Sequence, residues 1–334
     1  MVLVIPLGFV LYRWRSTGFD WKAFSATFTG VDWGWLALSL PLILLAYAGR
    51  ALRWVVMIRP LRPNPSFWNV FVATAIGFTA IVFFGRAGEL VRPYLIASKE
   101  KLSFSSQVAA WVLERILDLM MVLLIFGIAL ARISKSGIQP GPKITLVLQL
   151  GGTVVGLTAA VCLAVLLLFR YFTESMQHRL IESIGFLPEK YRTRLAGFLK
   201  AFLQGMQSTR SNSYVIQLIA YSVLEWGLVI LCYASLLKAF PATSAFSLTD
   251  VVIFLGFVSF GAAIQIPGVG GGVQVASVLI FTEFFGLSFE TATGLALVLW
   301  LVTFVIIVPI GVALAFHEGL RWKTLSRISE EVEN

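Results

Sequence analysis

Two long runs of residues without a single charge limit the class of fold that this chain can adopt. Residues Ile144–Phe169 and Thr291–Phe316 are each 26 residues long and uncharged. About 20 mainly apolar residues in a helix are enough to cross the hydrocarbon core of a bilayer. With 58% hydrophobic and only 13% charged residues, and a mean hydropathy of +0.87, the chain is typical of an all-α integral membrane protein.

We expect a single polytopic membrane domain over residues 1–334. Its six predicted transmembrane helices are Met1–Tyr12, Trp33–Val55, Val108–Ala131, Ile144–Phe169, Tyr214–Leu237 and Thr291–Phe316. The first is short, with no basic segment before it and no small-residue cleavage site after it, which argues against a signal peptide. It is either a short first span or a span whose beginning is missing.

Two further apolar regions, 67–96 and 251–285, are each broken in the middle by glycine and proline. The breaks fall at 83–93 and 265–274, and about a dozen residues after each comes the tripeptide Leu-Ser-Phe, at 102–104 and 287–289. Paired, interrupted segments in two halves of a membrane protein are typical of transport sites built from broken helices. The alternative is two tight loops that only join helices.

The distribution of basic residues favours a re-entrant hairpin for each broken region. Simple crossings would place the arginines of 50–62 and the basic stretch 170–210 on opposite faces of the membrane. With hairpins, 16 Lys and Arg lie on the cytoplasmic side and seven on the outer side, as the positive-inside rule requires. We therefore expect six crossings, both termini in the cytoplasm, and hairpins entering from opposite faces as an inverted-topology repeat.

The cytoplasmic segment 170–212 contains an amphipathic helix pattern. Its apolar stripe follows helical spacing and consists of Leu195, Phe198, Leu199, Phe202, Leu203 and Met206. Such a helix either lies in the lipid headgroup region or packs on the helical bundle.

Charged residues within the apolar segments form the candidate site. Charges in a membrane interior are costly and usually face a cavity or one another. The first hairpin has three of them, Arg86, Glu89 and Arg92, and the next span has Glu114, Arg115 and Asp118 near its start. Glu225 stands alone in the middle of its span.

Two interpretations of these charges remain open. Guanidinium groups match phosphate oxygens and stay charged, so Arg86 and Arg92 are candidates for binding an anionic headgroup. Alternatively, Arg86 or Arg92 is neutralised by Glu114 or Asp118 and holds the hairpin to the span. Glu225 is either a neutral, hydrogen-bonded acid or a titrating group that couples transport to protons.

Three motifs resemble those of the flippase-like family, the integral-membrane part of lysylphosphatidylglycerol synthases, which also occurs in stand-alone proteins. They are Gly-Arg-Ala-Gly-Glu-Leu-Val-Arg at 85–92, Leu-Glu-Arg-Ile-Leu-Asp at 113–118 and Pro-Gly-Val-Gly-Gly-Gly at 267–272. The resemblance covers nearly the whole chain. It implies movement of a lipid between leaflets, with lysyl-phosphatidylglycerol as the substrate of the fused proteins.

The expected substrate site combines the charged residues with the glycine-rich breaks. It comprises Gly85, Arg86, Gly88, Glu89, Arg92, Glu114, Arg115, Asp118, Glu225, Pro267, Gly268, Gly270, Gly271 and Gly272. One departure from the family concerns the second break, where Gln274 and Val275 replace a typical Arg-Glu pair. The other is that the chain has no soluble aminoacyl-transferase domain, so we do not expect it to act as that enzyme.

We therefore predict a lipid translocase of a prokaryotic cytoplasmic membrane. Its cargo would be an anionic phospholipid, an aminoacyl-phosphatidylglycerol, a polyprenyl phosphate or a glycolipid precursor. The alternatives are a membrane enzyme that acts on a lipid phosphate, and a non-transporting subunit that assists a lipid-modifying enzyme partner. The +9 net charge is scattered through short loops, so we expect no nucleic-acid partner, and we expect neither a metal nor a cofactor.

Overall fold

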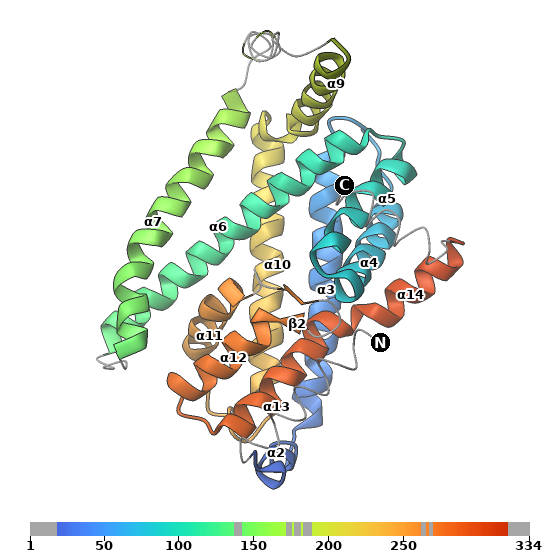
Figure 1. The fold of residues 1–334 in the computed structure, drawn as a ribbon. Helices are drawn as coiled ribbons and strands as arrows, with labels where there is room; N and C mark the ends of the chain where they lie inside the picture. The colour runs from blue at the N-terminus through green and yellow to red at the C-terminus, as the bar shows by residue number, and fades with distance from the viewer. Residues whose placement is uncertain are drawn as a thin grey trace.

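The structure, a computed structural model, describes residues 19–136, 142–171, 176, 182, 189–261, 265–266 and 270–319. Nearly all of this part is helical (Figure 1). The first half contains α2 (Trp21–Ala26), α3 (Trp33–Ile58), α4 (Phe67–Phe84), the 3-10 helix η1 (Gly85–Leu90), α5 (Val91–Glu100), α6 (Phe104–Ser136) and α7 (Pro142–Tyr171). The second half contains α9 (Glu189–Gly205), η2 (Gln207–Thr209), α10 (Asn212–Lys238), α11 (Leu248–Gly261), β1 (Gln265–Ile266), β2 (Gly270–Gly271), α12 (Gly272–Glu283), α13 (Phe289–Trp300), the π-helix η3 (Leu301–Val305) and α14 (Ile307–His317).

Four helical segments of the described part are long and apolar enough to cross a membrane. They are Trp33–Ile58, Phe67–Glu100, Asn212–Lys238 and Phe289–His317. The helices α6 and α7 are also long, with 33 and 30 residues. The predicted span Met1–Tyr12 lies outside the described residues. An all-helical membrane protein is thus confirmed at this level.

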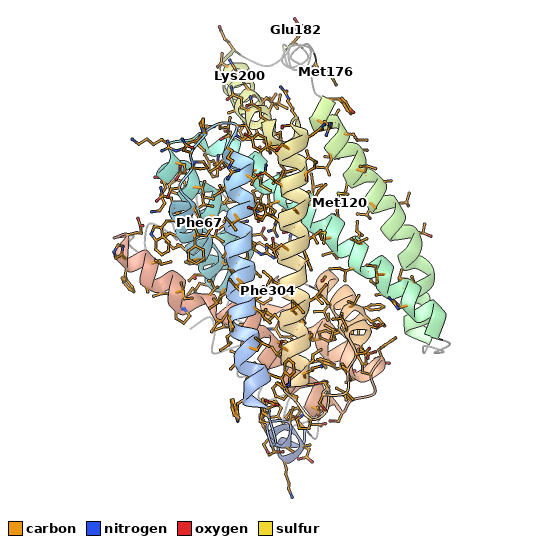
Figure 2. The ribbon with its side chains drawn as sticks, turned by 180° about the vertical axis from the view of Figure 1, so that it is seen from behind. Phe67, Met120, Met176, Glu182, Lys200 and Phe304 are labelled. Carbon is orange, nitrogen blue, oxygen red and sulfur yellow. The ribbon has the colours of Figure 1, made fainter. Side chains whose placement is uncertain are left out.

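The centre of the fold is an antiparallel pair of helices, α3 and α10, which lie side by side in both views (Figure 1, Figure 2). At one end, the backbone N–H of Asp32 donates to the carbonyl of Ala239 at 2.8 Å. At the other end, Arg59 donates to the side chain of Gln217 at 3.1 Å. Each helix is followed by one of the two glycine-broken regions, which therefore start at opposite ends of the pair.

The first broken region reverses direction. Gly77 in α4 lies against α5, where an added Cβ would come within 3.2 Å of the Arg92 Cα. At the base, the carboxylate of Glu100 accepts hydrogen bonds from the backbone N–H of Ser66 and the side chain of Asn69. The segment Phe67–Glu100 is therefore a helical hairpin with η1 as its turn, not one straight helix.

The second broken region reverses direction as well. Its turn contains a two-residue antiparallel pairing, Gln265 with Gly271 and Ile266 with Gly270, between α11 and α12. At its base, the ring centroids of Phe246 and Phe285 lie 4.5 Å apart. The turns of the two hairpins contact each other, β1 against η1.

The repeated Leu-Ser-Phe tripeptide has the same structural task in both halves. Ser103 accepts a hydrogen bond from the backbone N–H of Ser106 at the start of α6, and Ser288 accepts one from Thr291 at the start of α13. A serine in this position satisfies a backbone donor that the first helical turn leaves unpaired. The helix that leaves each hairpin is thus capped in the same way.

The span α13–η3–α14 connects the surroundings of the two hairpins. Its first part, α13, packs on α12, and its last part, α14, packs on α4, where Gly311 lies against Thr79. Between them, η3 widens the helix to a π-turn, a feature often found at functional sites.

The amphipathic pattern at 195–206 corresponds to α9 and the residue after it. Met206 is fully buried in the core and α9 packs on α6, whereas Leu195 and Phe198 are exposed. The end of this stripe therefore packs on the bundle, as one of the two interpretations of the sequence predicted.

A substitution at Gly88 tests whether η1 must approach α4 closely. A Cβ at this position would lie 2.5 Å from the carbonyl carbon and oxygen of Ala80. We expect Gly88→Ala to destabilise the protein by about 1–3 kcal/mol, because the backbones must separate. The measurement is the melting temperature in detergent.

Gly227→Ala is the matched control, since a Cβ there meets no other atom within 4 Å. Alanine favours a helix over glycine, so this variant should melt at the original temperature or slightly above it. Equal melting of Gly88→Ala and the original protein would contradict the close packing of the hairpin.

Candidate functional site

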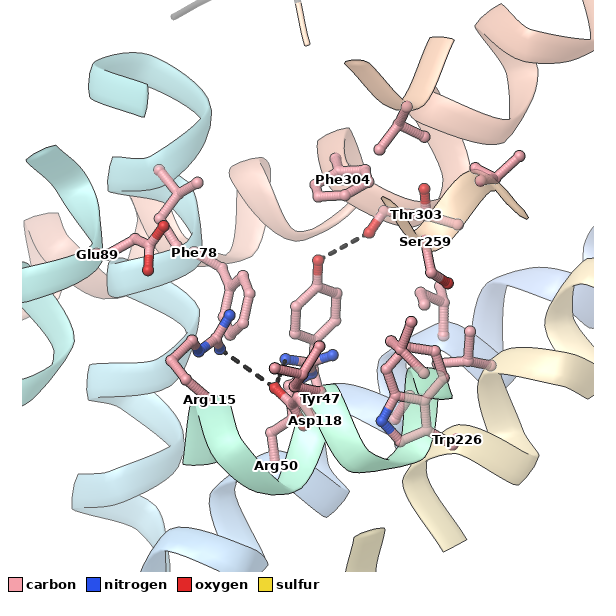
Figure 3. A pocket seen from close by; sticks show the side chains of 18 of the residues that line it. Tyr47, Arg50, Phe78, Glu89, Arg115, Asp118, Trp226, Ser259, Thr303 and Phe304 are labelled. Atoms are coloured by element: carbon pink, nitrogen blue, oxygen red, sulfur yellow. Dashed lines mark hydrogen bonds and ion pairs between the residues drawn. The ribbon is translucent and has the colours of Figure 1, made fainter. Parts of the chain in front are cut away.

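A cavity of about 700 Å³ lies where the two hairpins meet. Helices of both halves surround it: α3, α4, η1 and α6 from the first, and α10, α11, α12 and η3 from the second. Its volume is in the range of cavities that enclose a small-molecule ligand. Figure 3 shows its lining from close by.

Among the residues that the structure describes, all the charged ones that line the cavity come from the first half of the chain. They are Arg50 of α3, Arg86 and Glu89 of η1, and Arg115 and Asp118 of α6. In Figure 3, Arg115 and Asp118 project from one helix, and Glu89 lies beyond Phe78. One wall of the cavity is therefore polar, with three guanidinium groups and two carboxylates.

The remainder of the lining is neutral and mainly apolar. Large side chains contribute most of it, among them Phe78, Trp111, Trp226 and Phe304. The Tyr47 hydroxyl donates a hydrogen bond of 2.8 Å to the backbone carbonyl of Thr303 in the π-turn (Figure 3). The cavity thus has the two-sided character of an amphiphilic ligand.

Behind the polar wall, Arg53 is the centre of a buried charge network. Its side chain is 0% exposed and lies within ion-pair distance of three carboxylates. Its Nη2 is 3.1 Å from Glu114 and 2.7 Å from Asp118, and its Nη1 is 3.3 Å from Glu225. Nη1 also donates to the Ser222 hydroxyl at 3.1 Å. One guanidinium group therefore joins α3, α6 and α10.

Arg92 belongs to this network rather than to the cavity lining. Its guanidinium group pairs with both oxygens of Glu114 and lies 4.7 Å over the Trp54 ring and 5.2 Å over the Phe78 ring. This arrangement matches the structural interpretation, in which Arg92 holds the first hairpin to α6. Arg86, the other predicted headgroup ligand, is exposed and lines the cavity.

Two expectations from the sequence are corrected here. Arg50 and Arg53, counted with the basic residues of the cytoplasmic side, lie inside α3, and Arg53 is fully buried. Glu225 has basic partners after all, because Arg50 lies 2.8 Å and Arg53 3.3 Å from its carboxylate. Both corrections have one origin: Arg50 and Arg53 belong to the membrane helix α3 and pair with carboxylates of α6 and α10.

The glycines of the motifs shape the two turns. Gly85 ends α4 with a φ of +64° and Gly271 precedes α12 with a φ of +98°, a backbone region that side chains disfavour. Gly270 belongs to β2, and Gly272 is the buried first residue of α12. The predicted site residues Pro267 and Gly268 lie outside the described residues.

The site residues that sequence reasoning missed are Arg50, Arg53 and the neutral lining. The sequence did contain a signal for the two arginines: they are three residues apart, near the end of the predicted apolar span Trp33–Val55. In the part of the chain that the structure describes, no three His, Cys, Asp or Glu side chains gather as metal ligands would.

Arg53→Met tests the central role of this arginine. Removing a buried cation leaves carboxylates unpaired, which costs about 3–5 kcal/mol. We expect a severe loss of folded protein in detergent, measured as monodisperse yield and melting temperature. Arg59→Met, at the residue that directly follows α3, removes a partly buried bond to Gln217 and should cost far less. Similar losses in both variants would contradict the special position of Arg53.

Comparison with known proteins agrees with the resemblance of the three motifs. No curated protein and no solved structure matches the chain. The model of the lysylphosphatidylglycerol synthase TM region matches residues 1–311. Since the match extends over most of the chain, this protein belongs to the family of the lysylphosphatidylglycerol synthase TM region.

Proposed function

We propose that the protein is a translocase that moves a lipid with an anionic or aminoacylated headgroup between the leaflets of the cell membrane. The observation that carries this proposal is the two-sided cavity between the hairpins, with its charges on one wall and apolar side chains on the rest. A lipid has the same division into a charged headgroup and hydrocarbon. Family membership supports a lipid as the ligand.

The polar wall suits a phosphate group. Arginine is always charged and its planar fork matches phosphate oxygens, and three such side chains face this cavity. The apolar wall then receives the beginning of the hydrocarbon chains. Arg86, Arg50 and Arg115 are the residues that we assign to the headgroup, whereas Arg92 and Arg53 support them from behind.

The arrangement in the membrane is part of the proposal. The two hairpins start at opposite ends of the α3–α10 pair and their turns meet, which supports re-entrant hairpins in an inverted-topology repeat. Six crossings would place both termini in the cytoplasm of a prokaryotic cell, with the hairpin turns near the bilayer midplane. Irregular backbone at that depth requires a protein or water environment, which the cavity supplies.

Lipid movement can be tested with a matched pair of substitutions on α12. Val273 lines the cavity, whereas Val275, two residues later, is 69% exposed. We expect Val273→Phe to slow translocation of acyl-labelled phosphatidylglycerol in liposomes by about tenfold or more, a change of about 1.4 kcal/mol in the barrier. Val275→Phe should keep the original rate. The measurement is the fraction of label that a membrane-impermeant quencher reaches.

Other outcomes would favour the alternatives. Chemical conversion of the labelled lipid would indicate an enzyme, and absence of both movement and conversion would favour an accessory subunit of a lipid-modifying enzyme. Equal translocation by the two phenylalanine variants would show that lipid does not pass through this cavity.

The membrane arrangement predicts a pattern of accessibility. Single cysteines at Asn64 and Ser98, the exposed flanks of the first hairpin, should react with an impermeant reagent from the cytoplasmic side only. Cysteines at Ala245 and Ser288, which flank the second hairpin, should react from the outer side only. The native cysteines are both buried and should react little. Flanks of one hairpin on opposite sides would exclude re-entry.

A further inference from the structure

The two oxygens of the Asp118 carboxylate have different environments. Oδ1 accepts a hydrogen bond of 2.7 Å from Arg53, which is fully buried. Oδ2 faces two arginines of the cavity wall, Arg115 at 3.4 Å and Arg50 at 3.7 Å. Figure 3 shows Asp118 beside both of these groups. One oxygen is thus anchored behind the wall, and the other lies between two cationic groups at its surface.

The contacts on the cavity side are the weaker ones. Charge-assisted hydrogen bonds between nitrogen and oxygen are usually about 2.7–2.9 Å long. Both distances at Oδ2 exceed this range, and the Arg115 side chain is 41% exposed. Its contact with Glu114 of the buried network is also long, at 3.5 Å. Arg115 can therefore exchange partners with little disturbance of that network.

The charged groups of the site do not balance, and one further anion would neutralise them. Two ion pairs with arginine favour the charged form of Glu225. With all groups charged, the arginines of the site are Arg50, Arg53, Arg86, Arg92 and Arg115, and its carboxylates are Glu89, Glu114, Asp118 and Glu225. Five cations face four anions, so the site has one excess positive charge. A ligand with a single negative charge brings this cluster to neutrality.

We propose that Asp118 Oδ2 is a resident substitute for a phosphate oxygen. In the unliganded protein it occupies the position between Arg50 and Arg115 that the phosphate of a singly charged phosphodiester lipid takes on binding. This inference rests on the proposed function, and it names the anion-recognition residues and the headgroup charge that they select.

Binding is then an exchange of ion-pair partners without any covalent change. Arg115 and the Nη1 of Arg50 turn from Oδ2 to the phosphate oxygens, whereas Oδ1 remains bonded to Arg53. The Nη2 of Arg50 stays with Glu225. Asp118 therefore keeps a cationic partner in both states. An uncharged lipid gains nothing at this position, because it cannot replace the carboxylate as a partner of the two arginines.

The same charge balance disfavours a headgroup with more than one negative charge. A phosphomonoester has about 1.5–2 negative charges at neutral pH. It would leave the site with an excess of negative charge next to Asp118 and Glu89. The site should therefore prefer a phosphodiester with one charge to a phosphomonoester with the same hydrocarbon chains.

The test measures binding of short-chain lipids to the purified, full-length protein in detergent. The probes share two eight-carbon chains and differ in the headgroup: phosphatidylglycerol, phosphatidic acid and uncharged diacylglycerol. Inorganic phosphate separates recognition of a lipid headgroup from recognition of the free anion. We expect phosphatidylglycerol to bind more tightly than the other three.

Asp118→Asn tests the substitution of one anion for another. Asparagine keeps an oxygen for Arg53 and removes the competing charge, so phosphatidylglycerol should bind on the order of five- to tenfold more tightly. Glu283→Gln on α12 is the matched control, because it removes one carboxylate outside the cavity lining and should leave the affinity unchanged. Unchanged or weaker binding by a folded Asp118→Asn variant would overturn the proposal.

Arg115→Gln keeps the test valid if Asp118→Asn does not fold, because the Arg115 side chain is partly exposed. This variant should bind phosphatidylglycerol no better than diacylglycerol, with an unchanged melting temperature. Retained preference for phosphatidylglycerol would overturn the proposal. Because binding in detergent is independent of movement in liposomes, a protein that binds as expected but moves no lipid would refute the translocase alone.

Discussion

The burial of Arg53 among three carboxylates is the interaction on which the rest of the structure depends. In a membrane protein, a charged group that water cannot reach needs an oppositely charged partner within the fold. Here the guanidinium group of Arg53, on α3, is the partner of two carboxylates of α6 and one of α10. Of these helices, α3 and α6 contribute to the polar wall of the cavity, and α10 lines its neutral side. The positions of Asp118 and Glu225, and through Glu114 that of Arg92 and the first hairpin, follow from this one group.

The arginines differ in task although they share a chemistry. Arg53 and Arg92 are buried and held by carboxylates, and Arg92 also stacks over Trp54. Arg50, Arg86 and Arg115 instead reach the cavity. A rigid layer of ion pairs thus supports a more accessible layer, which is the usual requirement for a binding site whose side chains must keep their geometry while a ligand comes and goes.

Much of the architecture follows from local sequence signals. Glycine at 85, 88 and 271 indicated where the chain must bend or approach another backbone, and the repeated Leu-Ser-Phe tripeptide indicated two equivalent helix starts. The ion-pair partners of the charged groups could not be predicted from the sequence, because they are distant in the chain. Glu225, for example, pairs with Arg50 of a helix in the other half. The apolar cavity wall could not be predicted either, since residues such as Val273 and Val275 differ in environment but not in type.

The buried network also has a consequence for biogenesis. As the chain is synthesised, α3 enters the membrane with two arginines, and the first half of α6 follows with two carboxylates and one arginine. Each such charge costs about 2.5–3.5 kcal/mol at the centre of an isolated helix, so these helices gain by associating before they disperse into lipid. Together with Arg92, the charged residues of α3 and α6 have an excess of positive charge until α10 is inserted. Glu225 is the carboxylate through which α10, in the second half of the chain, pairs with Arg50 and Arg53 of α3.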